Sequence, residues 1–468
     1  MSEYQLPQGW MPSAIQNITS ADGLISDGDW VESKDQDPSG SIRLIQLADI
    51  GDGDFRNKSN RFMSEDKASL LNCTLLEEGD VLVARMPDPL GRACLFPGVG
   101  QPAVTVVDVC LIRVGSRSAL TNHLLKYWIN SPSFRGLISE NASGTTRKRI
   151  TRKKLEKFEV PVPSLAEQKV IADKLDTLLA QVENTKARLE RIPQILKRFR
   201  QSVLAAAVSG RLTGTGEQNF ATIPVEQLAK QKKYSLGIGP FGSNLKVSDY
   251  REAGHPLVFV REIRANQFGD DATKYVSGEK FDELKAHRVA PGDILITKMG
   301  DPPGDIAIYP LDRPEAVITA DCIKLSVDES AYCRDYVAYA MQSEQFRRDV
   351  LSISAGVAQQ KVNLTKFRKL PLQVPPKAEQ TEIVRRVDQL FAHADRIEQQ
   401  VNNALARVNN LTQSILAKAF RGELTEQWRK DNPELISGEN SAEALLERIK
   451  AERAAVKPAK RIRRKINA

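Results

Sequence analysis

The chain has 468 residues, which exceeds what one compact core usually holds and suits two or three domains. Its apolar content of 41% and charged content of 27% are ordinary for a soluble globular protein. The sequence shows neither an apolar run of membrane-spanning length nor a secretory signal, so we expect a cytoplasmic, nucleoid-associated protein. The net charge of +8 is not in the globular segments, because residues 1–158 carry 19 basic and 19 acidic groups and residues 214–371 carry 21 of each. Any contact with nucleic acid must therefore come from locally basic faces.

In chain order, the sequence predicts a globular segment, a long helix, a second globular segment, a second long helix and a tail. Each globular segment mixes buried strands with a short helix, so we expect an α+β fold. Its clearest strand follows a Gly-Asp turn, at residues 80–84 in the first segment and 293–297 in the second. The five segments are residues 1–158, 159–213, 214–371, 372–425 and 426–468.

An internal repeat is the strongest signal in the sequence. Residues 160–213 match residues 372–425 without a gap at 17 of 54 positions. The shared motifs are Ala-Glu-Gln at the start of each helix and Gly-x-Leu-Thr after its end. Residues 61–96 match residues 274–309 more weakly, at 10 of 36 positions. The helices therefore repeat well, and the globular segments repeat poorly.

Each long helix carries apolar residues at the 4-3-4-3 spacing of a coiled coil. The first helix should run from about residue 166 to residue 208 and be kinked at Pro193. Tandem copies commonly pack about a pseudo-two-fold axis, so we expect the two helices to pair antiparallel as a coiled coil. The predicted seam consists of Ile171, Leu175, Leu178, Val182, Thr185, Leu189, Ile192, Leu196, Phe199 and Val203, and of Ile383, Val387, Leu390, Ala394, Ile397, Val401, Ala404, Val408, Leu411 and Ile415.

Candidate DNA-contact residues come from two kinds of loop that recur in both globular segments. One kind follows the Gly-Asp strands, and the other is a basic run just before each long helix. Arginine can pair with guanine and glutamine with adenine in the major groove, while lysine mainly holds phosphate. A solvated face explains such runs in many proteins, but recurrence at equivalent places favours DNA contact. The candidates are Arg85, Arg92, Arg147, Lys148, Arg149, Arg152, Arg261, Arg264, Lys298, Gln359, Gln360 and Lys361.

The sequence shows no catalytic grouping and no metal or cofactor motif. Gly237-x-Gly239-x-x-Gly242 fits a dinucleotide fingerprint, but too few residues follow it for a crossover helix, which favours a structural turn. Asp301-Pro302-Pro303 is followed by Gly304, where an amino-methyltransferase would need an aromatic residue for the flipped base. The five cysteines lack a C-x-x-C pair and predict reduced, mostly buried thiols: Cys73, Cys94, Cys110, Cys322 and Cys333.

The repeated helices, the Gly-Pro-Phe-Gly-Ser-Asn-Leu-Lys run at residues 239–246 and the tail sequence after Gly422 resemble those of type I restriction-modification specificity subunits. The resemblance is specific for the enterobacterial subclass that contains the K-type enzyme, type IA, and it covers essentially the whole chain. It implies two target-recognition domains that bind a bipartite, asymmetric double-stranded DNA sequence. It also implies two partner methyltransferase subunits that use AdoMet on adenine N6, and restriction subunits that use ATP and Mg²⁺ against foreign DNA.

The resemblance therefore implies a non-catalytic subunit with no cofactor of its own. Two alternatives remain open on the residues alone: an autonomous two-headed DNA-binding regulator and an architectural coiled-coil tether. The outward helix faces and a tail helix with Ala442, Leu445, Leu446 and Ile449 are the candidate docking surfaces for partner subunits. The basic run at residues 457–465 either touches DNA phosphates or is solvated.

Overall fold

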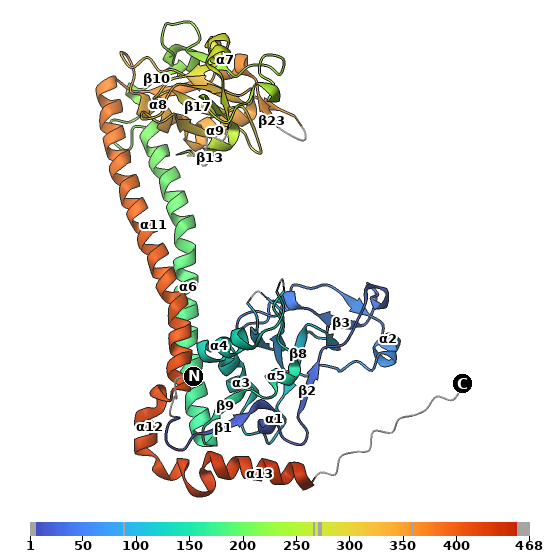
Figure 1. The fold of residues 1–468 in the computed structure, drawn as a ribbon. Helices are drawn as coiled ribbons and strands as arrows, with labels where there is room; N and C mark the ends of the chain where they lie inside the picture. The colour runs from blue at the N-terminus through green and yellow to red at the C-terminus, as the bar shows by residue number, and fades with distance from the viewer. Residues whose placement is uncertain are drawn as a thin grey trace. The chain divides into compact units, whose positions relative to one another are not determined.

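The computed structural model describes residues 6–87, 89–145, 147–264, 267–269, 274–356 and 360–455. The chain forms two compact units, the first of residues 1–189 and 404–468 and the second of residues 190–403. Each unit combines one globular domain with parts of both long helices, α6 (Leu165–Val208) and α11 (Lys377–Phe420) (Figure 1). The predicted bounds of the first helix are confirmed, α11 lies within the predicted segment 372–425, and Pro193 does not break α6. The basic run at residues 457–465 lies outside the described residues.

The first unit is built on an antiparallel sheet, a smaller mixed sheet and a two-stranded ribbon. The antiparallel sheet has the order β2 (Leu24–Asp27), β8 (Val109–Arg113), β5 (Val81–Ala84) and β6 (Ala93–Leu95). The mixed sheet has β4 (Phe62–Met63), β3 (Ile42–Ile45) and β7 (Ala103–Thr105), and the ribbon pairs β1 (Met11–Ala14) with β9 (Glu159–Val162). The helices are α1 (Ile15–Ile18), α2 (Glu65–Leu70), α3 (Asn122–Ile129), α4 (Pro132–Asn141), α5 (Arg152–Leu155), α12 (Glu426–Asp431) and α13 (Ala442–Ala455).

The second unit repeats this topology with one more strand, β16, in its mixed sheet. Its antiparallel sheet has the order β11 (Leu236–Ile238), β21 (Cys322–Leu325), β17 (Ile294–Thr297) and β19 (Ile306–Ile308). The mixed sheet has β15 (Tyr275–Val276), β12 (His255–Val258), β20 (Ala316–Ile318) and β16 (Arg288–Val289), and the ribbon pairs β10 (Ala221–Pro224) with β24 (Pro371–Val374). Two small additions are the hairpin of β13 (Ile263–Arg264) and β14 (Gln267–Phe268), and a sheet of β18 (Met299–Gly300), β23 (Gln360–Val362) and β22 (Ser354–Ala355). The helices are α7 (Gly278–Glu283), α8 (Arg334–Met341), α9 (Glu344–Ser352) and α10 (Leu364–Arg368).

The Gly-Asp strands β5 and β17 are buried on both faces, which explains their unbroken apolar sequence. Successive side chains of a strand point to opposite faces, so Val81 and Val83 enter one core while Leu82 and Ala84 enter another. The turn before each strand forms as predicted. Asp80 and Asp293 are buried, and each carboxylate accepts a hydrogen bond from the backbone N–H three residues earlier, at 2.8 and 2.9 Å.

Parts of the two long helices lie side by side within each unit, and they run antiparallel. In the first unit the start of α6 contacts the end of α11, and Val182 shares a core with Ile415 and Leu416. In the second unit the end of α6 contacts the start of α11, and Arg200 pairs with Asp395 at 2.6 Å and Glu398 at 2.8 Å. The predicted seam is wrong at two positions.

Thr185 and Leu411 are exposed rather than buried in the seam. The Thr185 hydroxyl instead bonds the carbonyl of Gln181 on its own helix, at 2.8 Å. Leu411 lies on an exposed side of α11, whereas further along this helix Phe420 packs on Trp128 of the first globular domain with ring centroids 5.0 Å apart. A purely heptad pattern cannot anticipate this change of partner.

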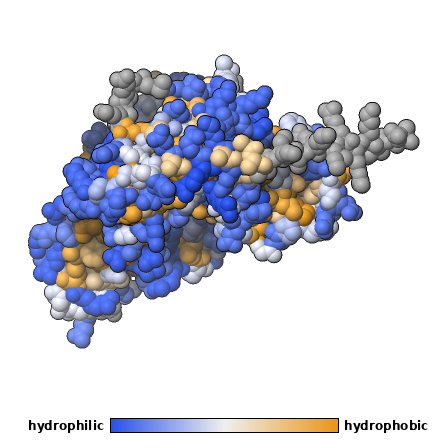
Figure 2. Space-filling model, turned by 90° about the horizontal axis from the view of Figure 1, so that it is seen from below, coloured by the Kyte–Doolittle hydropathy of each residue, from blue (hydrophilic) through white to orange (hydrophobic). Residues whose placement is uncertain are grey.

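The tail helix α13 is folded onto the first unit and is not free to dock a partner through its apolar face. Ala442, Leu445 and Ile449 are buried in the first unit's core, and Arg453 donates to the carbonyl of Gln16 at 2.5 Å. The prediction that these residues form a docking surface is therefore wrong. On the face of the molecule shown in Figure 2, hydrophilic residues dominate and apolar residues lie scattered among them.

Candidate nucleic-acid interface

A short hairpin just before each long helix carries the candidate basic and amide residues, and the two hairpins have the same register. In the first unit Ser143 bridges to Arg149, and in the second Ala355 pairs with Lys361, a shift of 212 residues in both strands. Arg147 and Lys148 are exposed on the first hairpin, and Gln360 and Lys361 are exposed on the second. Gln359, the counterpart of Arg147, lies outside the described residues.

Each hairpin is held against the residue that follows the Gly-Asp strand. The Ile150 N–H donates to the Arg85 carbonyl at 3.2 Å, and the Val362 N–H donates to the Lys298 carbonyl at 2.9 Å. In the second unit, Met299 and Gly300 add a further strand to the hairpin. The structure therefore brings together the two kinds of loop that the sequence analysis had singled out separately.

A turn between the last two sheet strands completes the arrangement in both units. The turn is residues 106–109 in the first unit and 319–322 in the second. The backbone N–H of Arg85 donates to the carbonyl of Asp108 at 2.9 Å, and that of Lys298 donates to the carbonyl of Asp321 at 2.7 Å. The sequence analysis missed these turns, although the aspartates recur at the shift of 213 residues that relates the globular segments.

Four of the candidate arginines have structural roles or lie elsewhere in the fold. Arg92 is buried and donates to the carbonyls of Ile50 at 2.6 Å and Leu47 at 2.7 Å. Arg152 lies on α5 and pairs with Glu156 at 2.6 Å. Arg261 and Arg264 belong to a separate part of the second unit, next to or within the hairpin β13–β14.

Arg85 is also wrong as a direct DNA contact. Its side chain is 5% exposed and forms an ion pair with Asp27 and a hydrogen bond to the Val107 carbonyl. A guanidinium has five N–H donors and can hold several loops together, which is what Arg85 and Arg92 do. We conclude that these two residues shape the loops that carry the exposed candidates. The candidates that lie at the hairpins and the loops beside them are Arg147, Lys148, Arg149, Lys298, Gln360 and Lys361, and the exposed Arg261 and Arg264 remain predictions elsewhere in the second unit.

The exposed candidates differ in chemistry between the two units. Arg149 lies 3.5 Å from the carboxylate of Asp108 and is partly exposed, so it can exchange this contact for another acceptor. Its counterpart Lys361 is exposed, and Gln360 replaces Lys148. Lys298 is half-buried and donates to the carbonyl of Ala320 at 3.2 Å. The backbone arrangement is thus repeated while the side chains that it presents are not.

The dinucleotide-like glycines do not form a nucleotide site. Gly237 lies within β11, and the loop after this strand leads to a short 3-10 turn at residues 247–249 rather than to a helix. Among the described residues, no cluster of histidine, cysteine and acidic side chains could hold a metal ion, and no helix is long and apolar enough to cross a membrane. All five cysteines are free thiols, and burial raises the pKa of Cys110 and Cys322 to about 12.

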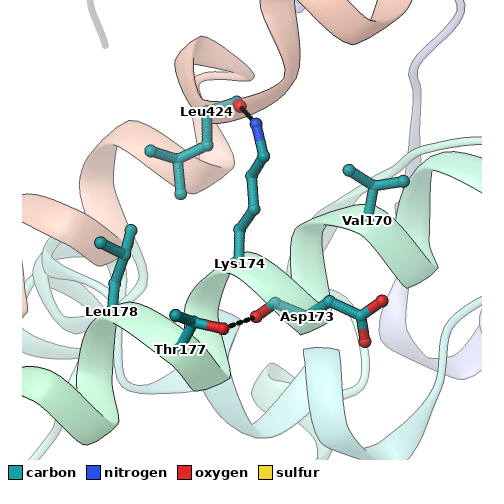
Figure 3. A pocket seen from close by; sticks show the side chains of 6 residues that line it. All are labelled: Val170, Asp173, Lys174, Thr177, Leu178 and Leu424. Atoms are coloured by element: carbon teal, nitrogen blue, oxygen red, sulfur yellow. Dashed lines mark hydrogen bonds between the residues drawn. The ribbon is translucent and has the colours of Figure 1, made fainter.

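The helix ends also repeat their contacts in detail. In the first unit Lys174 donates to the carbonyl of Leu424 at 2.6 Å, and in the second unit Arg386 donates to the carbonyl of Leu212 at 2.6 Å. Lys174 crosses a shallow groove lined by Val170, Asp173, Thr177, Leu178 and Leu424 (Figure 3). The sequence motifs Ala-Glu-Gln and Gly-x-Leu-Thr thus mark equivalent surfaces in the two units.

Comparison with known proteins places this arrangement in a family. The model of the type I restriction modification DNA specificity domain matches residues 7–194 and 256–407. The chain belongs to this family. It is 44% identical over 375 residues to the EcoBI specificity subunit of Escherichia coli, with 76% of each chain covered. It is 42% identical over 342 residues to the EcoKI specificity subunit of Escherichia coli strain K12, with 71% of this chain and 72% of that protein covered.

Solved structures show the same fold. The crystal structure of the HsdS subunit from Thermoanaerobacter tengcongensis matches with a TM-score of 0.54 at 19% identity, over 90% of this chain and 99% of that chain. A chain from a structural study of complex assembly and conformational transition of the type I R-M system matches with a TM-score of 0.67 at 18% identity, over 90% and 99%. The protein is therefore a type IA-like specificity subunit, a recognition subunit and not a catalytic one.

Proposed function

We propose that this specificity subunit reads a bipartite, asymmetric target in duplex DNA, with one half-site for each globular domain. The observation that carries the proposal is the repeated hairpin, which presents Lys148 and Arg149 in one unit and Gln360 and Lys361 in the other. A common backbone keeps the geometry of base contact, and unlike side chains select unlike bases. Two identical half-sites would require like side chains instead.

We further propose that the subunit recruits two methyltransferase subunits, one for each unit, and through them the restriction subunits. The repeated contacts of Lys174 with Leu424 and of Arg386 with Leu212 support this stoichiometry, because they build two equivalent surfaces for one kind of partner. The groove beside the contact of Lys174 with Leu424 is a candidate docking surface (Figure 3). AdoMet would then bind to the methyltransferase subunits, and ATP with Mg²⁺ to the restriction subunits.

The first experiment is co-expression of the subunit with its methyltransferase partner and mapping of methylated adenines in the host genome. We expect a methylated sequence of two specific parts separated by an unspecific spacer, and a mass corresponding to two partner subunits in the purified complex. Methylation without sequence preference, or a palindromic single-part target, would contradict the proposal.

The second experiment assigns the half-sites with two single variants in the assembled complex. Arg149→Ala should change the preference at one half-site only, and Lys361→Ala should weaken binding through the other. If Lys361 holds a phosphate, its loss should also reduce the slope of log affinity against log salt by about 0.9. Lys450→Ala is the matched control, because Lys450 is an exposed cation on the tail helix. Equal effects of all three variants would count against the assignment.

A further inference from the structure

Each globular domain exposes a large aromatic side chain at the same place in its fold. Trp30 is 67% exposed and Phe241 is 65% exposed. Each lies two residues after a glycine that ends the first strand of the antiparallel sheet, Gly28 after β2 and Gly239 after β11. A single exposed aromatic needs no explanation, but its recurrence at equivalent positions in two diverged domains does.

The equivalence of the two positions is established by backbone contacts. The N–H of Gly28 donates to the Val109 carbonyl at 2.8 Å, and the N–H of Gly239 donates to the Cys322 carbonyl at 3.2 Å. A Cβ atom on Gly28 would lie 1.9 Å from the Val106 carbonyl oxygen, and one on Gly239 would lie 1.9 Å from the Thr319 carbonyl oxygen. Each glycine therefore lets the chain pass closely over the turn of its own unit, residues 106–109 or 319–322.

This turn is the one that holds the candidate DNA-contact loops. In the second unit, Gly239 packs on the turn at residues 319–322, and Lys298 binds the same turn through its backbone and its side chain. The Lys298 ammonium lies 5.7 Å from the centre of the Phe241 ring. The aromatic, the lysine and the strand β23 with Lys361 are thus linked at the end of β17 through Lys298 and its neighbour Met299.

The first unit has the same construction with a different aromatic. Gly28 packs on the turn at residues 106–109, and the same turn carries Asp108, which faces Arg149 of the first hairpin. The Trp30 indole N–H donates to Glu32 at 3.2 Å, which leaves the ring faces open. In both units the aromatic residue follows a backbone segment that is fixed by a close glycine contact.

We propose that Trp30 and Phe241 each make an apolar contact with a base of the half-site that their domain reads. The inference rests on the proposed DNA-reading function and adds two residues to it. Apolar side chains read thymine methyl groups in the groove or insert between base steps, and cations beside them hold the flanking phosphates. Lys298 beside Phe241 supplies this charge, which favours duplex DNA over an uncharged protein partner.

The test uses the complex of this chain with its methyltransferase partner and duplexes that carry the mapped target. Phe241→Ala should weaken binding by at least about fivefold, the lower limit expected for an aromatic contact with a base. The change in sequence preference should be confined to one half-site, and Trp30→Ala should affect the other. Because no phosphate contact is lost, the dependence of affinity on salt should stay the same.

Two matched controls lie in the same units. In the second unit, Leu311 is 67% exposed and lies beside Gly292, at the end of β17 opposite Lys298. In the first unit, Leu70 is 71% exposed on α2. Leu311→Ala and Leu70→Ala should leave affinity and preference unchanged. Phe241→Trp should retain most of the affinity, because it preserves an aromatic surface.

Three results would separate failure of this inference from failure of the proposed function. If the wild-type complex shows no preference for its mapped target, the DNA-reading function itself is wrong. If the wild type is selective but Phe241→Ala and Trp30→Ala behave like the leucine controls, the aromatic contacts are wrong. A loss of affinity with a reduced salt slope would also overturn the inference, because the effect would then pass through Lys298.

Discussion

Replacing Glu167 by alanine should destabilise the first unit strongly, whereas the same change at its counterpart Glu379 should not. The Glu167 carboxylate is fully buried. It accepts hydrogen bonds from the Trp10 indole at 2.8 Å, the Thr425 hydroxyl at 2.6 Å and the Arg429 guanidinium at 2.6 Å. Truncation would leave a mostly buried guanidinium without its anion.

The expected cost follows from these contacts. Removing one partner of a buried ion pair costs about 3–5 kcal/mol. Arg429 also donates to the carbonyl of Gly422 at 2.7 Å and keeps this contact, so the lower part of that range applies. Glu379 is only partly buried and accepts hydrogen bonds from two threonine hydroxyls, Thr213 and Thr215. Because Glu379 forms no ion pair among the described residues, removal of its carboxylate should cost about 1 kcal/mol.

The chain offers a selective probe for this measurement. All four tryptophans, Trp10, Trp30, Trp128 and Trp428, belong to the first unit, so tryptophan fluorescence follows the unfolding of that unit alone. We expect the urea midpoint of this signal to fall markedly in Glu167→Ala and to fall less in Glu167→Gln, which keeps part of the hydrogen bonding. Glu379→Ala should leave it unchanged. If Glu167→Ala unfolds at the same midpoint as Glu379→Ala, the buried ion pair does not stabilise the unit as argued.

Two further changes test the packing. Trp128→Ala should lower the free energy of unfolding of the first unit by about 3–5 kcal/mol in the same urea assay, because the ring packs on Phe134 and Phe420. The counterpart of Trp128 in the second unit is Ala340, which lines a pocket. Burial lowers the pKa of Lys324 in the second unit, so the unfolded chain holds this proton more tightly and stability rises with pH toward the ordinary lysine range. At pH 7 we expect Lys324→Leu to have the higher free energy of unfolding, because it buries no charge. This advantage over the wild type, followed by circular dichroism, should shrink from pH 7 to pH 10. A constant difference would show that this charge is not desolvated.

The elements with strong local signals could be predicted from the sequence. The Gly-Asp turns formed as expected because their geometry depends only on the glycine, the aspartate and the N–H three residues earlier. The long helices were bounded correctly because prolines precede them and glycines follow them. In each case, neighbours in sequence determine the structure.

The roles of the arginines could not be predicted, because their partners are distant in sequence. Arg92 donates to carbonyls at residues 47 and 50, and Arg85 to a carbonyl at residue 107. Nothing near Arg85 in the sequence distinguishes it from an exposed base-reading arginine. The exposed Phe241 and Trp30 were overlooked for the converse reason, since an aromatic residue after a strand usually enters the core.

The contacts at the helix ends explain why the helices repeat better than the globular domains. The threonine of each Gly-x-Leu-Thr motif bonds the glutamate of the other copy's Ala-Glu-Gln motif, Thr425 with Glu167 and Thr213 with Glu379. A change in either motif would therefore remove a contact made by the other copy, so both are constrained. The hairpins have no such reciprocal partner and can diverge. The tail then breaks the equivalence, because Arg429 and the buried face of α13 belong to the first unit alone. A variant that releases the tail should thus make the surroundings of Glu167 resemble those of Glu379.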